Sequence, residues 1–145
     1  RLVWVLIWLC YLVKWDMDNY LMGFDYGSKR IGVAVGQTLT ATARPLAIVL
    51  VKNQQIDWAR ITALIQEWQP DALVVGLPKH ADGSDSTSTV AARRFSRQLQ
   101  GRYQLPVHSI DERLSSVAAA EKISRGDLDA VAAQIILETW FTECL

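Results

Sequence analysis

Residues 24–36 read FDYGSKRIGVAVG, and this stretch decides the fold. It joins two short β-rich runs, residues 20–25 and Arg30–Gln37, through a turn at residues 26–29, which predicts an antiparallel hairpin. The first run ends on a carboxylate, Asp25, that neither caps a helix nor completes an ordinary hairpin turn. A strand that ends in this way is a candidate for a functional site.

Beyond the hairpin, strand and helix patterns alternate along the chain. The all-apolar run ALVVGL at Ala72–Leu77 is typical of a strand buried on both faces. The order predicts an α/β fold in which an antiparallel meander continues into parallel strands, giving a mixed five-stranded sheet with helices on both faces. The other expected strands are residues 45–51 and 106–110, and the expected helices are residues 56–68, 90–100, 114–123 and 128–141.

Length and composition favour one ordinary globular domain. The chain has 145 residues, is 50% apolar and carries no formal net charge, so no global positive field indicates a nucleic-acid partner. The apolar run at residues 2–13 is shorter than the roughly 20 residues that a membrane-spanning helix needs. We expect residues 1–16 to be an apolar leader outside the functional fold, and residues 17–145 to form a single domain.

Three acidic residues follow or precede elements that should meet at one edge of the sheet. Asp25 ends the first strand, Glu112 follows the last strand, and Asp129 lies in the first turn of the last helix. Ligands of open α/β sheets bind beyond the carboxyl ends of the strands, so the pattern predicts a carboxylate cluster there. Carboxylate oxygens suit Mg²⁺ or Mn²⁺, and such clusters support two-metal hydrolysis of phosphodiesters. Taken singly, the same residues would also fit a turn, a surface ion pair and a helix-dipole contact.

Several polar residues could contact the phosphates of a substrate. Loop residues near a helix start offer hydroxyl and N–H groups to anions, and arginines at positions i, i+1 and i+4 share one helix face. Solvent-exposed charge and simple helix capping are the alternative interpretations. The candidate substrate-binding residues are Lys29, Arg30, Ser84, Arg93, Arg94, Arg97 and Arg113.

Five stretches together resemble the YqgF family, also called the RuvX-like or Holliday junction resolvase-like family, which has an RNase H-like fold. The resemblance covers residues 19–143 and rests on strings that are specific in combination. They are FDYGSKRIGVAVG, ARPL (43–46), VVGLPKHADGS (74–84), DERLSSVAA (111–119) and the C-terminal LDAVAAQIILETWF. Residues 122–127 form a shorter connection than is usual in the family.

The resemblance implies a cytoplasmic, metal-dependent nuclease that processes the 5′ end of precursor 16S rRNA. It assigns the catalytic and metal-binding roles to Asp25, Glu112 and Asp129, with Mg²⁺ or Mn²⁺ as cofactor. The implied partners are nucleic acid and ribosomal precursor particles, without stable membrane association. Two alternatives remain: cleavage of branched DNA such as Holliday junctions, and a non-catalytic RNA-binding role in ribosome assembly. An ATPase of the actin type is disfavoured, because those proteins need two such domains.

Overall fold

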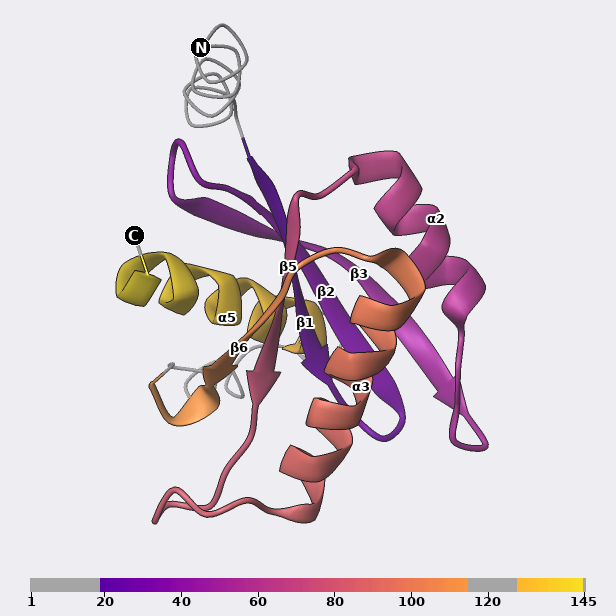
Figure 1. The fold of residues 1–145 in the computed structure, drawn as a ribbon, viewed down its shortest axis with the longest axis vertical. Coiled ribbons are helices and arrows are strands. Elements are labelled where there is room, and N and C mark those ends of the chain that lie inside the picture. Colours follow the sequence, from indigo (N-terminus) through magenta and orange to yellow (C-terminus); the bar gives the residue numbers. More distant parts are fainter. Residues whose placement is uncertain (1–18, 115–127, 145) are drawn as a thin grey trace, which may run out of the picture.

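The chain folds around one mixed sheet of six strands in the order β4-β3-β2-β1-β5-β6 (Figure 1). A computed structural model describes residues 19–114 and 128–144. The strands are β1 (Tyr20–Tyr26), β2 (Arg30–Gln37), β3 (Thr42–Lys52), β4 (Gln55–Ile56), β5 (Ala72–Leu77) and β6 (Val107–Asp111). The helices are α2 (Trp58–Trp68), α3 (Thr87–Tyr103) and α5 (Leu128–Cys144), with a short 3-10 turn at Glu112–Leu114.

Strand direction brings three strand ends to one edge of the sheet. β1 and β2 form the expected antiparallel hairpin, whereas β1 pairs with β5, and β5 with β6, in parallel. In this register Phe24 lies opposite Val75, and Leu77 lies opposite Asp111. The carboxyl ends of β1, β5 and β6 therefore lie along a single rim.

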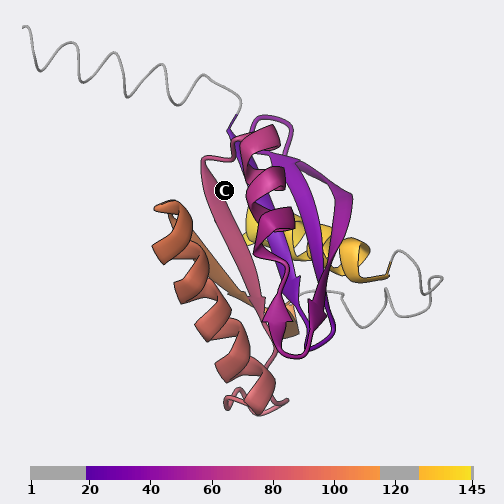
Figure 2. The same cartoon turned by 90° about the vertical axis from the view of Figure 1, so that its right-hand side faces the viewer.

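Helices cover both faces of the sheet, as predicted from the sequence (Figure 2). Side chains alternate along β1, so Met22 and Phe24 pack with α2 and α3, while Leu21 packs with α5. The ring of Phe24 lies 5.6 Å from that of Phe95 of α3 in an edge-on contact. The same alternation places Asp25 on the α5 face and Tyr26 on the α3 face.

The sheet has six strands rather than the five expected, because Ile56 does not belong to the helix. Residues Gln55 and Ile56 pair with Lys52 and Val51 as the short strand β4. The two residues between the strands, Asn53 and Gln54, have φ values of 51° and 63°, which close a tight hairpin. Ile56 stands at helical spacing from the apolar residues that follow, so the sequence pattern alone could not show that it lies in a strand and not in the helix.

Side-chain caps set the first residues of helices α2 and α3. Asp57 accepts a hydrogen bond from the backbone N–H of Arg60, so α2 begins at Trp58. Ser86 and Thr89 form a reciprocal capping box, which starts α3 three residues before the predicted position. Most of the helix predicted at 114–123, and the leader 1–16, lie outside the described residues. Among the helices of the described part, none is long and apolar enough to cross a bilayer.

Candidate active site

Asp25 stands at the end of β1 on the face covered by α5. Its partner across the hairpin is Gly32. A Cβ atom built on Gly32 would lie 1.7 Å from the backbone oxygen of Asp129. Glycine at position 32 therefore allows the first turn of α5 to rest directly on β2, and this contact brings Asp129 to the end of β1.

Glu112 reaches the same rim from the turn that follows β6. A Cβ atom on Gly76 of β5 would lie only 2.7 Å from the Oε1 atom of Glu112. The missing side chain at Gly76 thus leaves the space that the Glu112 carboxylate occupies. There the carboxyl groups of Glu112 and Asp25 share a hydrogen bond.

Asp129 forms the outer side of this cluster. Its Oδ2 atom lies 3.3 Å from the Nε atom of Arg30, in an ion pair whose side chains are 28% and 57% exposed. Arg30 begins β2, next to the turn that follows Asp25. The three predicted acids thus converge, and one predicted phosphate-binding residue lies against them.

The acids perturb one another strongly. Burial raises the pKa of Asp25 to about 8, and the charge of Glu112, the hydrogen bond with Glu112 and the charge of Asp129 add to the shift. Burial also raises the pKa of Glu112, although the hydrogen bond from Asp25 opposes this and the charge of Asp111 adds to it. The pair therefore holds a proton on Asp25, which donates to the Glu112 carboxylate. A positive charge bound beside these acids would reduce the electrostatic repulsion between their carboxylates.

The residues fit a hard divalent cation. All three candidate ligands present carboxylate oxygens, which Mg²⁺ and Mn²⁺ prefer over nitrogen or sulfur. Within residues 19–114 and 128–144, no three acidic, His or Cys side chains are already arranged as a complete metal site. In their present arrangement Asp25 is hydrogen-bonded to Glu112, and Asp129 pairs with Arg30. Cation binding would have to replace both interactions.

We expect the protein to lose stability as pH rises, and Mg²⁺ to restore it. The pKa of Asp25 is about 8 in the folded protein and 3.8 ordinarily, so the folded state keeps a proton that the unfolded chain has lost. The free energy of unfolding should therefore fall between about pH 4 and pH 8. Thermal unfolding at pH 5 and pH 8 should show a larger Mg²⁺-induced rise in Tm at pH 8. An equal rise at both pH values would contradict the buried acid pair.

Two of the predicted substrate-binding residues are hydrogen-bonded to nearby acids. The Ser84 hydroxyl donates to Asp82 at 2.6 Å. Arg113 donates to the Asp111 carboxylate at 2.6 and 2.9 Å, and to the Ala81 carbonyl at 3.4 Å. Arg113 thereby ties the loop before α3 to the end of β6. Their roles in substrate binding remain predictions.

The three arginines that were predicted to share one face of α3 have different surroundings. Arg93 pairs with Asp85 at 3.3 Å, while Arg94 and Arg97 are exposed. Arg94 faces a groove on the α3 side of the sheet, lined also by Tyr26, Gln54 and Gln98. No sequence pattern predicts this groove, because its walls come from elements far apart along the chain. Lys29 is exposed in the turn after β1, and its role is still a prediction.

Comparison with known proteins relates the sequence to one family. The sequence profile of the family described as "RuvX: Holliday junction resolvase" matches residues 19–143. A protein of Hydrogenovibrio crunogenus named "Putative pre-16S rRNA nuclease" is 49% identical over 126 residues, covering 86% of this chain and 94% of the relative. A relative of the same name from Pseudomonas paraeruginosa is 48% identical over 132 residues, covering 85% and 92%.

Solved structures agree with the predicted fold. RuvC of Thermus thermophilus, solved with a Holliday junction substrate, has a TM-score of 0.54 at 17% identity and covers 86% of this chain and 94% of its own. The fowlpox virus Holliday junction resolvase has a TM-score of 0.52 at 16% identity, with coverage of 87% and 99%. At these identities the likeness shows the fold alone. The RNase H-like α/β fold predicted from the sequence is confirmed.

Proposed function

Because this chain belongs to the RuvX family, we propose that it is a divalent-metal-dependent nuclease that processes precursor 16S rRNA. The observation that carries the proposal is the meeting of Asp25, Glu112 and Asp129 at one rim of the sheet. Relatives that cover most of the chain carry the name of a pre-16S rRNA nuclease, which supports this substrate over others. Such a nuclease would act in the cytoplasm, on rRNA within ribosomal precursor particles.

Asp25, Glu112 and Asp129 would hold the metal. Asp25 interacts with both other acids, so it would be the ligand that they have in common. Bound Mg²⁺ or Mn²⁺ supplies the charge that lowers the pKa of an attacking water and stabilises the leaving oxygen. To hold the metal, the Asp25–Glu112 pair would have to release its shared proton, so that both carboxylates present charged oxygens.

Arg30 is suited to receive the scissile phosphate. Its guanidinium lies against Asp129 at the solvent-exposed side of the acid cluster. If Asp129 held a cation, the guanidinium would lose that partner and could donate to phosphate oxygens. The ion pair with Asp129 would thus hold Arg30 beside the rim before a substrate binds. Without a bound cation, the acids would repel the phosphate backbone.

Cleavage assays separate RNA from branched DNA as the substrate. A labelled RNA that spans the 5′ end of 16S rRNA should be cut in Mg²⁺ or Mn²⁺, and should remain intact in EDTA. A four-way DNA junction tested in parallel addresses the family description as a Holliday junction resolvase. Preferential cutting of the junction would reassign the substrate to DNA. Metal-independent RNA binding without cleavage would instead indicate an assembly factor.

A further inference from the structure

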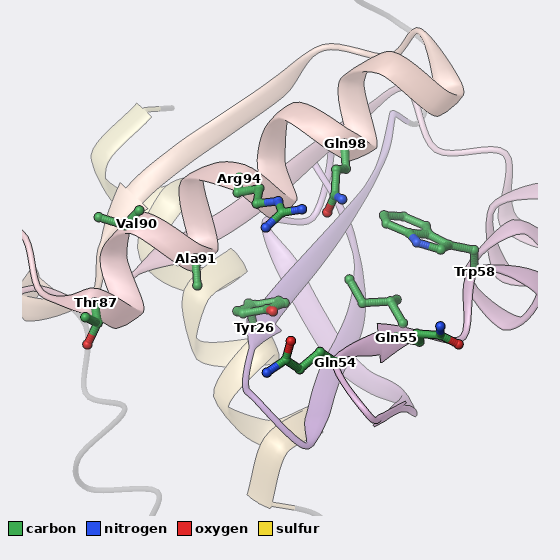
Figure 3. Close-up of a pocket in the computed structure, with 10 residues that line it drawn as sticks. Tyr26, Gln54, Gln55, Trp58, Thr87, Val90, Ala91, Arg94 and Gln98 are labelled. Atoms are coloured by element: carbon green, nitrogen blue, oxygen red, sulfur yellow. The ribbon is translucent and has the colours of Figure 1, made fainter.

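A groove lies on the α3 side of the sheet, on the opposite face from the acid cluster (Figure 3). Its volume is about 660 Å³, within the range of ligand pockets. Tyr26 lines the groove and directly follows Asp25 in β1, so the two side chains lie on opposite faces at the same end of the strand. The walls come from α3 and from the β3–β4 hairpin, including Arg94 and Gln54.

The charged group in this groove is available to a ligand. Arg94 is exposed and extends from α3 towards Tyr26 (Figure 3). Three other arginines, Arg30, Arg93 and Arg113, pair with carboxylates. Within the described ranges Arg94 has no such partner, and the groove lining contains no acidic residue. An anion such as a phosphate would therefore be attracted and not repelled.

Amide groups line the same space. Gln54, Gln55 and Gln98 surround the groove, and their side chains make no hydrogen bond to other described residues. Each amide both donates and accepts, which matches the mixed donors and acceptors on the edge of a nucleobase. Gln54 occupies a left-handed position, with φ of 63°, where glycine would be less strained. Gln54 therefore places an amide side chain at the groove, which a glycine at this position would not.

The groove also has an aromatic surface, the ring of Tyr26. The Tyr26 ring is half-buried and packs on Phe95, with ring centroids 5.1 Å apart. The ring also lines the groove (Figure 3). Bases of single strands stack on such rings, and each stack contributes about 1–3 kcal/mol by alanine substitution. A base in a duplex has its faces covered by neighbours, so this surface suits an unpaired nucleotide.

We propose that this groove binds an unpaired nucleotide of a strand that also reaches the acid cluster around the end of β1. Tyr26 stacks on the base, the glutamine amides contact the base edge, and Arg94 holds a phosphate. The turn between β1 and β2, with exposed Ser28 and Lys29, directly follows Asp25 and Tyr26, so a strand would pass from one face of the sheet to the other over this turn. This inference rests on the proposed nuclease function. It predicts cleavage of single-stranded RNA or DNA segments in preference to continuous duplex.

Binding without turnover tests the groove separately from the chemistry. The full chain is titrated in Ca²⁺ against fluorescent 12-nucleotide single strands of RNA and DNA, and against the matching duplexes, with anisotropy as the readout. Arg94→Gln should weaken single-strand binding about tenfold and reduce the salt slope by about 0.7, as for the loss of one phosphate contact. Arg60→Gln removes the same charge from an exposed position on α2 and should change affinity less than twofold. Circular dichroism confirms that both variants fold.

Photocrosslinking identifies the stacking residue. Among strands that carry 5-bromouracil at successive positions on either side of the cleavage position, one should crosslink to the peptide that contains Tyr26, and Gln98→Ala should lower the yield. Equal effects of Arg94→Gln and Arg60→Gln would overturn the groove proposal, as would duplex binding equal to that of single strands. The RNA and DNA arms show which sugar is preferred. Absence of metal-dependent cleavage would remove the proposed function but leave this binding result intact.

Discussion

Asp25→Asn should reduce metal-dependent cleavage by about a thousandfold or more, the scale seen when an essential catalytic group is removed. Asp25 interacts with both other acids, so its loss removes the ligand that they would have in common. An amide also cannot supply the negative charge that a divalent cation requires. Rates measured at saturating RNA and Mg²⁺ give the effect on the chemical step.

The same substitution should stabilise the metal-free protein at high pH. In the wild type, ionised Asp25 sits beside Glu112 in a buried position, and each unit of raised pKa corresponds to about 1.4 kcal/mol. Asn keeps the shape and can donate to Glu112, so the free energy of unfolding at pH 8 should rise by about 2 kcal/mol or more. Glu67→Gln makes the same chemical change at an exposed position on α2 and should leave activity and stability unchanged. An active or destabilised Asp25→Asn would contradict the assigned role.

Gly32→Ala should disrupt the fold and the site together. The new Cβ would lie 1.7 Å from the Asp129 oxygen and 2.9 Å from the Ala130 nitrogen, and both are backbone atoms that cannot rotate away. Helix α5 must move off β2, which should lower the free energy of unfolding by at least about 3 kcal/mol. Protein that still folds should lose activity about a hundredfold, because Asp129 moves with the helix.

A second glycine provides the control for this experiment. A Cβ on Gly101 in α3 would meet no atom within 4 Å, so Gly101→Ala should stabilise the protein by about 0.5–1 kcal/mol. Urea unfolding of both variants measures the contrast. If Gly32→Ala unfolds at the same urea concentration as the wild type and keeps its activity, then the close contact between α5 and β2 does not position Asp129.

The sequence predicted the parts of the fold that depend on local pattern. The hairpin and the buried strand Ala72–Leu77 were found where their apolar patterns placed them. The meeting of Asp25 and Glu112 was also predictable, because parallel strands bring their carboxyl ends to one edge. Asp129 comes from α5, and its place beside them depends on the contact of that helix with Gly32. The metal-binding roles of the three acids stay predictions. The short strand β4 was missed, since two residues carry too little periodicity to separate Ile56 from the following helix.

The sequence does not predict which acidic residue each arginine contacts. Arg30, Arg93 and Arg113 look alike in sequence, yet each lies against a different acid. Arg94 is left facing a groove whose walls are residues from β1, the β3–β4 hairpin and α3. Which arginine is available for a substrate depends on distances between elements, and no local pattern encodes those distances.

Crystals grown in Mn²⁺ would test the central claim most directly, through the anomalous scattering of the metal. The account predicts Mn²⁺ density in contact with carboxylate oxygens of Asp25, Glu112 and Asp129, with the Arg30 guanidinium released from Asp129. Well-occupied Mn²⁺ elsewhere on the protein, with Asp25 still hydrogen-bonded to Glu112 and Asp129 still paired with Arg30, would contradict it.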